Sequence, residues 1–243
     1  TGICDIVLPE VSALQDTVDE HRRHKDVYEH TLTVLQQAMD LETGPDGAVP
    51  GPDLRLRLAA LMHDIGKPAT RRFMPDGTVT FHAHDYVGAR MTAKRMRALH
   101  FDKQTIKDVS RLVELHLRFH GYADSPWSDS AVRRYVTDAG PLLARLGCLT
   151  RADVTTGNRR KAAMLSHAYD DLERRIEALR QQEELAAIRP ELDGQEIMTE
   201  LGIKPGPEVG KAYKFLLDLR MERGPIGKEL AREALHSWWA TQQ

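Results

Sequence analysis

Apolar residues recur every three or four positions along most of the chain, which is the spacing of one buried face of an α-helix. This pattern predicts helices over residues 27–41, 53–64, 84–99, 103–119, 129–138, 141–156, 158–187, 194–201, 207–222 and 227–240. Residues 71–84 break the pattern, and their Pro-Asp-Gly turn between β-prone pieces predicts a small hairpin or an ordered loop. We therefore expect an all-α protein.

An acidic residue stands at the end of the second predicted helix, within the sequence AALMHDIGKPATRR of residues 59–72. Gly66 is expected to stop this helix, and Pro68 to prevent its continuation. Asp64 would then lie in the last turn, where a carboxylate meets the negative end of the helix dipole at a cost of about 0.3–1 kcal/mol. Helix stability therefore does not explain Asp64, whereas a bound cation would.

Other predicted helices carry a potential metal ligand on their apolar face. His30, His116 and Asp153 each continue a stripe of apolar residues, on three different helices. A carboxylate is almost never buried without a partner or a metal, which makes Asp153 the most informative of the three. Taken singly, each has an ordinary alternative: a core histidine is commonly hydrogen-bonded, and an inward aspartate commonly caps a helix or pairs with arginine. Together with His63 and Asp64, they favour a shared metal site.

Composition and charge restrict the partners of this chain. Its 243 residues include 34 Lys and Arg against 36 Asp and Glu, a formal net charge of −2, so any nucleic-acid surface must be a local patch. Two cysteines are too few for a disulfide framework or a cysteine-based zinc site. Neither a signal peptide nor an apolar run of membrane-spanning length is present, so we expect a cytoplasmic protein without a membrane partner. Because the chain begins at Thr1 rather than Met, we expect it to be part of a longer protein.

The order His30, His63–Asp64, Asp153 resembles the signature of HD-domain metal-dependent phosphohydrolases. The sequence HDIGKPATR is one of the more specific forms of that motif. The resemblance implies an HD-domain helical bundle in which these four residues bind a divalent metal.

Two further histidines, His84 and His116, extend the resemblance to HD members that hold two metals. An equally open alternative is that they only contact substrate phosphate. The neighbouring residues that could substitute for them are His82, Asp85 and His120. A ligand set rich in imidazole suits Mn, Fe, Ni, Co or Zn better than an all-oxygen Mg site, and Mg is kept as an alternative. The prediction is therefore one or two divalent ions.

Asp64 and Lys67 are the predicted catalytic residues. A metal held at Asp64 would lower the pKa of its bound water toward neutrality. Lys67 follows the His-Asp pair as in HD-x-G-K proteins and would neutralise charge that develops on a phosphoester; its alternative role is to cap the helix C-terminus. Arg71 and Arg72 either help to hold the phosphate or only solvate their loop. The resemblance implies a phosphoester substrate, such as a 2′,3′-cyclic phosphate or a 2′-phosphate on RNA, or a nucleotide.

A second resemblance covers nearly the whole chain. The segments HRRHKDVYEHTLTVL, LTRADVTTGNRRKA and LDGQEIMTELGIKPGPEVGKA look like the C-terminal half of bacterial, and most closely actinobacterial, CCA tRNA nucleotidyltransferases that carry an HD domain. In that family an N-terminal head with a Gly-Ser loop and paired aspartates adds the nucleotides, and this sequence contains neither feature. The resemblance implies a fragment that does not add nucleotides by itself. It also implies three parts: residues 1–26 as the end of a neck or linker, 27–187 as the HD domain and 188–243 as a small C-terminal helical unit that binds tRNA.

Basic residues gather at three places in the sequence, one of which is the short run VRRYV of residues 132–136. The candidates for RNA binding come from the other two, and they are Arg90, Lys94, Arg95 and Arg97 on one predicted helix, and Arg159, Arg160 and Lys161 at the start of another. Such runs are usually solvated faces, but the resemblance implies contacts with the tRNA backbone. Two rival functions stay open: a non-catalytic tRNA-binding scaffold with a vestigial HD site, and a freestanding HD nucleotide phosphohydrolase, against which the segment LGIKPGPEVG argues. The sequence does not indicate an oligomeric state.

Overall fold

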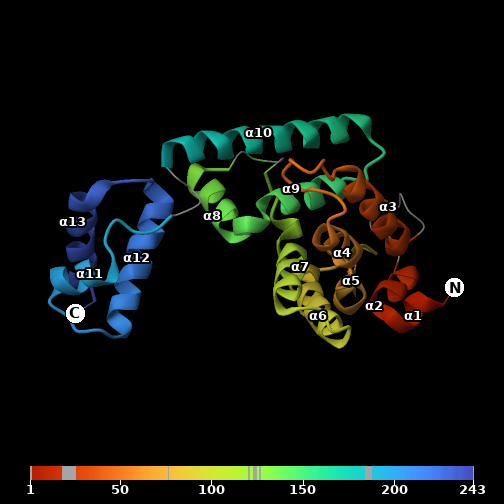
Figure 1. Cartoon of the computed structure of the whole chain (residues 1–243), viewed down its shortest axis with the longest axis horizontal. Coiled ribbons are helices and arrows are strands. Elements are labelled where there is room, and N and C mark those ends of the chain that lie inside the picture. Colours follow the sequence, from red (N-terminus) through yellow and green to blue (C-terminus); the bar gives the residue numbers. More distant parts are fainter. Residues whose placement is uncertain are drawn as a thin grey trace. The chain divides into compact units, whose positions relative to one another are not determined.

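The computed structural model describes residues 2–17, 26–75, 77–119, 121–122, 125, 127–183 and 188–242. The α-helices are α1 (Ile3–Val7), α2 (Pro9–Ser12), α3 (Val27–Asp40), α4 (Leu54–Met62), α5 (Lys67–Thr70), α6 (His84–Ala98), α7 (Lys103–Leu115), α8 (Asp129–Ala139), α9 (Leu143–Ala152), α10 (Arg159–Glu183), α11 (Gly194–Leu201), α12 (Pro207–Arg223) and α13 (Gly227–Ala240) (Figure 1). Short 3-10 helices are η1 (Ala13–Asp16), η2 (His116–Phe119) and η3 (Gly140–Leu142). The strands β1 (Arg72–Phe73) and β2 (Val79–Thr80) pair antiparallel where the sequence predicts a small hairpin or loop. The predicted all-α class is confirmed. Among the described helices, none combines the length and apolar character needed to cross a membrane.

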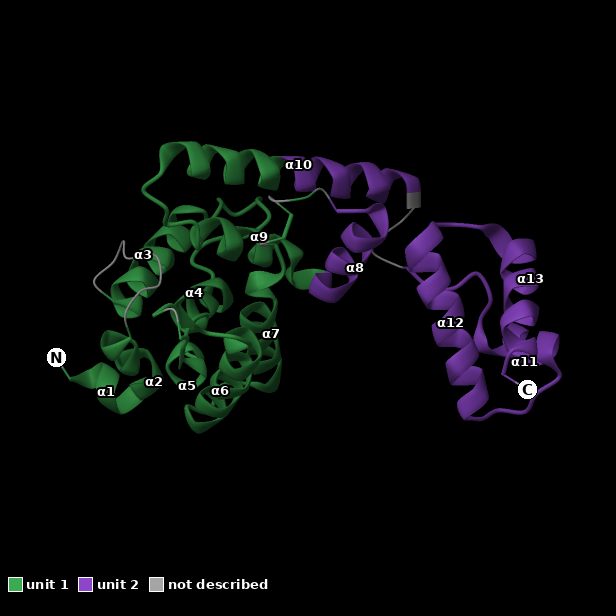
Figure 2. Cartoon of the chain, turned by 180° about the vertical axis from the view of Figure 1, so that it is seen from behind, with its two compact units in different colours: residues 1–125, 141–170 green, residues 126–140, 171–243 purple. Residues whose placement is uncertain are grey.

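The chain divides into two compact units (Figure 2). The first unit contains residues 1–125 and 141–170, and the second contains residues 126–140 and 171–243. The predicted domain boundaries at residues 26 and 187 stay predictions, because compactness alone does not show which segments fold independently.

The first unit is built around α4, which contacts α3, α7 and α9, while α6 packs along α7. Leu56, Ala59 and Ala60 of α4 are fully buried, whereas Leu54 at its start is 56% exposed. The small alanine side chains allow the neighbouring helices to approach α4 closely. The segments that carry the predicted site residues are thereby brought around one central helix.

Asp53 joins the start of α4 to α9. Its carboxylate accepts a hydrogen bond from the Leu56 amide (2.8 Å) and binds the Arg145 guanidinium (2.7 Å). Burial raises the pKa of Asp53, but the hydrogen bonds from Arg145 and Leu56 outweigh it and hold the pKa below its usual value. This contact fixes α9, which leads to Asp153, against α4, which leads to His63.

The second unit has an apolar core of its own within the C-terminal helices α11, α12 and α13. The buried residues of this core are Leu192, Ile197, Ala212, Leu216, Ala231 and Leu235. A capping box begins α11, in which the side chains of Asp193 and Glu196 each accept a hydrogen bond from the other residue's backbone N–H. α8 contacts α12, and the Arg133 side chain donates to the carbonyl oxygen of Met221 (3.0 Å). The helices α11, α12 and α13 form the small C-terminal helical unit that belongs to the predicted fold class.

The turn after α4 differs from the sequence-based prediction. α4 ends at Met62 rather than at residue 64, and Gly66 has a right-handed φ of −77°, so Gly66 is not a left-handed helix stop. Pro68 does not block a helix but lies in the first turn of α5, after Lys67. Glycine is needed at position 66 because α6 is so close: a Cβ there would lie 2.1 Å from the carbonyl oxygen of His84.

Two other helices also end earlier than predicted. α7 ends at Leu115, so His116 begins a 3-10 helix, and α9 ends at Ala152, so Asp153 follows it. The predicted site residues therefore lie largely at helix ends, where backbone groups lack intrahelical partners.

Candidate metal centre

The six side chains predicted as metal ligands converge in the first unit. They are His30 on α3, His63 and Asp64 in the turn after α4, His84 at the start of α6, His116 directly after α7 and Asp153 directly after α9. The side chain of Asp153 is 16% exposed and the other five residues are buried. They form two groups with ligand atoms within 4.8 Å of one another, which are His30, His63 and Asp153, and Asp64, His84 and His116.

The first group is tight enough to surround a single ion. Nε2 of His30 lies 3.0 Å from Oδ1 of Asp153 and 3.3 Å from Nε2 of His63. Nε2 of His63 lies 3.5 Å from the same Asp153 oxygen. Ligands that share one divalent ion at bond lengths of about 2.0–2.2 Å are separated by distances of this size.

The Asp64 carboxylate faces both groups. Its Oδ2 lies 3.3 Å from Nε2 of His63 and 3.5 Å from Nε2 of His30. Its Oδ1 lies 3.3 Å from Nε2 of His84, whose ring centre is 5.3 Å from that of His116. A carboxylate in this position can bind one ion through each oxygen, so the arrangement suits one or two metals.

Backbone carbonyl groups orient three of the imidazoles. Nδ1 of His63, His84 and His116 donates to the carbonyl oxygen three residues earlier, at 2.8, 2.8 and 2.6 Å. For His63 and His116 that carbonyl belongs to the last turn of a helix, so the ring both caps the helix end and directs Nε2 into the site. Because Nδ1 carries the proton, the neutral ring presents a lone pair at Nε2. Within the described residues, Nε2 of His84 and Nε2 of His116 are buried and have no hydrogen-bond partner.

The charges of this cluster favour a bound cation. Burial lowers the pKa of His63, but the carboxylates of Asp64 and Asp153 outweigh it and raise the pKa to about 10. Burial and the nearby charge of His63 lower the pKa of His116 to about 4, so this imidazole is neutral. In the absence of a metal, a proton on His63 supplies the positive charge that the carboxylates need. Inward lone pairs beside two carboxylates fit a divalent metal, which would take the place of that proton.

Lys67 adds a buried positive charge beside Asp64. Its Nζ lies 2.9 Å from Oδ2 of Asp64 and 5.5 Å from the centre of the Phe81 ring. Burial raises the pKa of Asp64, but the charges of His63 and Lys67 outweigh it and hold the pKa well below its usual value. The ammonium group therefore helps to keep Asp64 ionised.

The neighbouring candidates that the structure describes, His82 and Asp85, belong to neither ligand group. His82 is exposed, Asp85 is half-buried outside both groups, and His120 lies outside the described residues. Arg71 donates to a backbone carbonyl of η1 (3.2 Å), and Arg72 is exposed in β1. Of the described alternatives, His84 is thus the residue that reaches Asp64.

The predicted RNA-binding residues are mostly on the surface of α6 and α10. The exposed members are Arg90, Lys94 and Arg97 on α6, and Arg159, Arg160 and Lys161 at the start of α10. Arg95 instead forms a bidentate ion pair with Glu10, at 2.8 and 2.9 Å, which ties α2 to α6. Contact between these residues and RNA stays a prediction.

One residue at this site was missed in the sequence. The hydroxyl of Thr155, which is buried, lies 3.2 Å from Nδ1 of His30. Thr155 stands two positions after Asp153 in RADVTT, and this nearness to a ligand is its only sequence signal. Its pairing with a histidine 125 residues earlier depends on the tertiary fold.

A helical bundle with a buried His and Asp cluster is the architecture expected of an HD domain. The chain matches the HD domain family over residues 27–158, a range that includes all six side chains. This chain belongs to the HD-domain family.

Curated relatives extend this likeness to nearly the whole chain. It is 34% identical, over 99% of its length, to the A-adding tRNA nucleotidyltransferase of Deinococcus radiodurans. It is 35% identical, over 98% of its length, to the CC-adding tRNA nucleotidyltransferase of Thermus thermophilus. The matches cover 53% and 50% of those proteins, so the chain spans about half the length of the curated relatives it matches. The predicted relation to tRNA nucleotidyltransferases is confirmed as homology to part of these enzymes.

Proposed function

We propose that this chain is a metal-dependent phosphohydrolase that acts on phosphoesters, at RNA ends or in nucleotides. The observation that carries the proposal is the position of the Asp64 carboxylate, whose two oxygens face different groups of imidazoles in one buried cluster. Burying a carboxylate is costly without a counter-charge. The cluster contains two carboxylates, those of Asp64 and Asp153, whereas Lys67 contributes only one ammonium group. A divalent ion supplies the remaining positive charge.

Each group of side chains has a role in this proposal. His30, His63, Asp64 and Asp153 hold the first metal, and His84 and His116 hold a second one with Asp64. A metal bound here supplies Lewis-acid chemistry toward a phosphoryl oxygen and activates water near neutral pH. Lys67 keeps Asp64 ionised and adds positive charge next to the substrate phosphate. The carbonyl groups that accept from Nδ1 keep their imidazoles oriented with Nε2 toward the site.

The ligand types narrow the choice of metal. Four of the six proposed ligands are imidazoles and two are carboxylates. Imidazole suits Mn, Fe, Ni, Co or Zn, whereas Mg prefers an octahedral oxygen site, so we propose a transition metal and keep Mg as the alternative.

Elemental analysis combined with a hydrolysis screen tests the proposed function. The purified chain is expected to contain a divalent metal and to hydrolyse bis-p-nitrophenyl phosphate or a 2′,3′-cyclic nucleotide with added Mn, Ni or Co. Chelation should abolish the activity and added metal should restore it. Absence of both metal and hydrolysis would favour the rival function, a tRNA-binding scaffold with a vestigial site. Hydrolysis of nucleotides by a protein that does not bind tRNA would favour a freestanding nucleotide phosphohydrolase.

We further propose that the chain is the HD-bearing part of a tRNA nucleotidyltransferase and that it does not add nucleotides by itself. The half-length match to two such enzymes supports this. The closer affinity with actinobacterial members and the cytoplasmic location stay predictions.

Binding of tRNA is expected to depend strongly on salt. The exposed basic residues of α6 and α10 would neutralise backbone phosphates, and each such contact releases counterions. Fluorescence anisotropy with labelled tRNA should show an affinity that falls steeply between about 50 and 200 mM salt. An affinity that does not change with salt would contradict phosphate contacts.

Removal of the Thr155 hydroxyl is expected to weaken metal binding. Thr155→Val keeps the shape of the side chain but takes away the partner of His30 Nδ1, so the imidazole is less well oriented. Loss of such an outer contact typically lowers metal affinity about 10–100-fold. Competition with a coloured chelator measures the affinity, and thermal unfolding monitors the fold. Thr155→Ser keeps the hydroxyl and should stay close to wild type; equal loss in both variants would show that the hydroxyl does not orient His30.

A further inference from the structure

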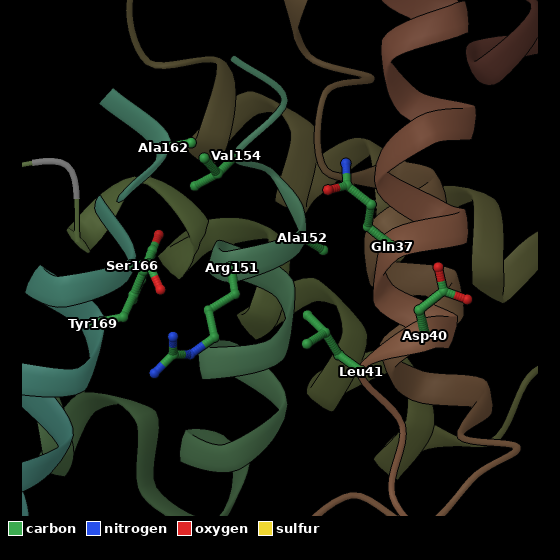
Figure 3. A pocket seen from close by; sticks show the side chains of 9 residues that line it. All are labelled: Gln37, Asp40, Leu41, Arg151, Ala152, Val154, Ala162, Ser166 and Tyr169. Carbon is green, nitrogen blue, oxygen red and sulfur yellow. The ribbon is translucent and has the colours of Figure 1, made fainter. Parts of the chain in front are cut away.

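The first unit contains a pocket that the metal centre does not use (Figure 3). It has a volume of about 400 Å³, within the range of sites for small organic ligands. The lining residues are Gln37 and Asp40 on α3 and Leu41 just after it, Arg151, Ala152 and Val154 at the end of α9 and just after it, and Ala162, Ser166 and Tyr169 on α10.

The pocket and the metal centre lie on two sides of the same turn. Ala152 and Val154 line the pocket, while the carboxylate of Asp153 between them contacts His30 and His63. A ligand in the pocket is therefore next to the metal centre but does not touch its ligand atoms.

The charges around the pocket do not favour an anion. Arg151 is paired with the carboxylate of Asp170 (2.9 Å), and its guanidinium lies 5.0 Å from the centre of the Tyr169 ring. Asp40 adds a second carboxylate at the exposed edge. A free phosphate would meet the Asp40 carboxylate and a guanidinium that is already paired with Asp170, so the pocket suits a neutral ligand.

The remaining lining combines an apolar floor with a polar edge. The apolar side chains come from Leu41, Ala152, Val154 and Ala162. Among the described residues, the side-chain amide of Gln37 has no hydrogen-bond partner, so its donor and its acceptor are both available. Figure 3 shows Gln37 on α3 and Leu41 at the end of this helix, across from Arg151. Such a lining suits a flat, neutral ring system with donors and acceptors along one edge.

We infer that this pocket binds a nucleobase that carries an exocyclic amino group. A glutamine amide forms paired hydrogen bonds with an amino group and the neighbouring ring nitrogen, as it does with adenine. The Asp40 carboxylate can accept a hydrogen bond from an amino group. This bond would replace the exposed one that Asp40 accepts from the Gln36 side chain (3.0 Å). Uracil has a ring N–H but no exocyclic amino group, so it cannot form the paired contact of an amino group and a ring nitrogen with Gln37 and still offer an amino hydrogen to Asp40.

The base could belong to a free nucleoside or to a single-stranded RNA, and the fold favours RNA. Ala162 and Ser166 lie one and two turns into α10, which starts with the exposed Arg159, Arg160 and Lys161. A phosphate backbone that follows this basic start of α10 could insert one unstacked base into the pocket. Single-stranded RNA is commonly recognised through such splayed bases together with backbone contacts.

Calorimetric titration of the full chain tests this inference without any metal. The ligands are adenosine, uridine, inorganic phosphate, and short oligoadenylate and oligouridylate. Adenosine is expected to bind more tightly than uridine, and oligoadenylate more tightly than adenosine, while phosphate alone should not bind. Equal affinity for adenosine and oligoadenylate would assign the pocket to free nucleosides. Binding of phosphate alone, or no binding of any nucleoside, would overturn the inference.

Filling the pocket provides the matched test. Ser166 is an exposed lining residue, so Ser166→Trp should fold normally and fill part of the pocket. The expected result is a loss of adenosine affinity of about tenfold or more, because the indole would occupy space that the base needs. The control is His167→Trp, an exposed neighbour that does not line the pocket and should bind adenosine normally. Equal affinity in the two variants would overturn the inference, and hydrolysis of bis-p-nitrophenyl phosphate, measured in parallel, reports on the metal centre separately.

Discussion

Asp64→Asn is expected to abolish both metal binding and phosphoester hydrolysis. The amide has the shape of the carboxylate but no charge, and its nitrogen cannot coordinate a metal. Since each Asp64 oxygen faces a different group of imidazoles, the substitution affects both proposed ion positions. Loss of an outer contact lowers metal affinity about 10–100-fold, so loss of this shared ligand should exceed about 100-fold. Elemental analysis and the hydrolysis assay measure the two effects.

Asp85→Asn is the matched control for this experiment. Asp85 follows His84 directly but belongs to neither ligand group. Metal content and hydrolysis should therefore stay near wild type. Wild-type turnover in Asp64→Asn would refute the assignment, provided that circular dichroism shows the same helix content in both variants. Asparagine is preferred to alanine at position 64 because alanine would leave a cavity beside the buried ammonium of Lys67, whereas the side-chain oxygen of asparagine can still accept a hydrogen bond from it.

Helix positions could be predicted because the apolar spacing reflects burial within each helix. The predicted helix over residues 194–201 has the same bounds as α11, and that over residues 27–41 ends one residue beyond α3. The prediction failed where helices end at the site. Residues 63 and 64, predicted as the end of the second helix, belong instead to a turn in which Gly66 lies close against α6.

The clustering of these His and Asp residues could be predicted, but not its geometry. His30 and His116 are inward because each continues an apolar stripe, and both are buried. The direction of each Nε2 depends instead on carbonyl groups at helix ends, and on Thr155 for His30. The ion pair of Arg95 with Glu10 is another contact between distant segments that a linear pattern of basic residues cannot reveal.

The position of Asp64 relative to α4 explains this acidic residue less well than its surroundings do. α4 ends two residues before Asp64, but the carboxylate still lies beyond the negative end of this helix. Within the described residues, its carboxylate oxygens lie 2.9–3.5 Å from three imidazoles and the Lys67 ammonium. The reason for an acid at this position is therefore the cluster of positive or metal-binding groups around it, and not the stability of α4.

Gly66→Ala is expected to destabilise the first unit and to weaken metal binding at the same time. The added Cβ would lie 2.1 Å from the His84 carbonyl oxygen and 2.7 Å from the Gly88 backbone nitrogen. Both atoms belong to the backbone of α6, so the helix as a whole must move away from the turn that carries His63 and Asp64. Overpacking of this kind costs about 1–3 kcal/mol, occasionally more. His84 moves with α6, so its Nε2 would also leave Oδ1 of Asp64.

Gly88→Ala, on the opposite side of the same contact, separates this steric effect from a general effect of replacing glycine. The Cβ of an alanine at position 88 would have its closest neighbours at 3.4 Å, which is an ordinary contact. Position 88 also lies inside α6, and in a helix interior alanine is favoured over glycine by about 1 kcal/mol. The two residues face each other, yet the expected changes in the free energy of unfolding have opposite signs. Chemical denaturation measures this difference, and chelator competition measures metal affinity. Unchanged stability in Gly66→Ala would mean that α6 can shift at little cost, in which case the distance from His84 to Asp64 is not fixed by this packing.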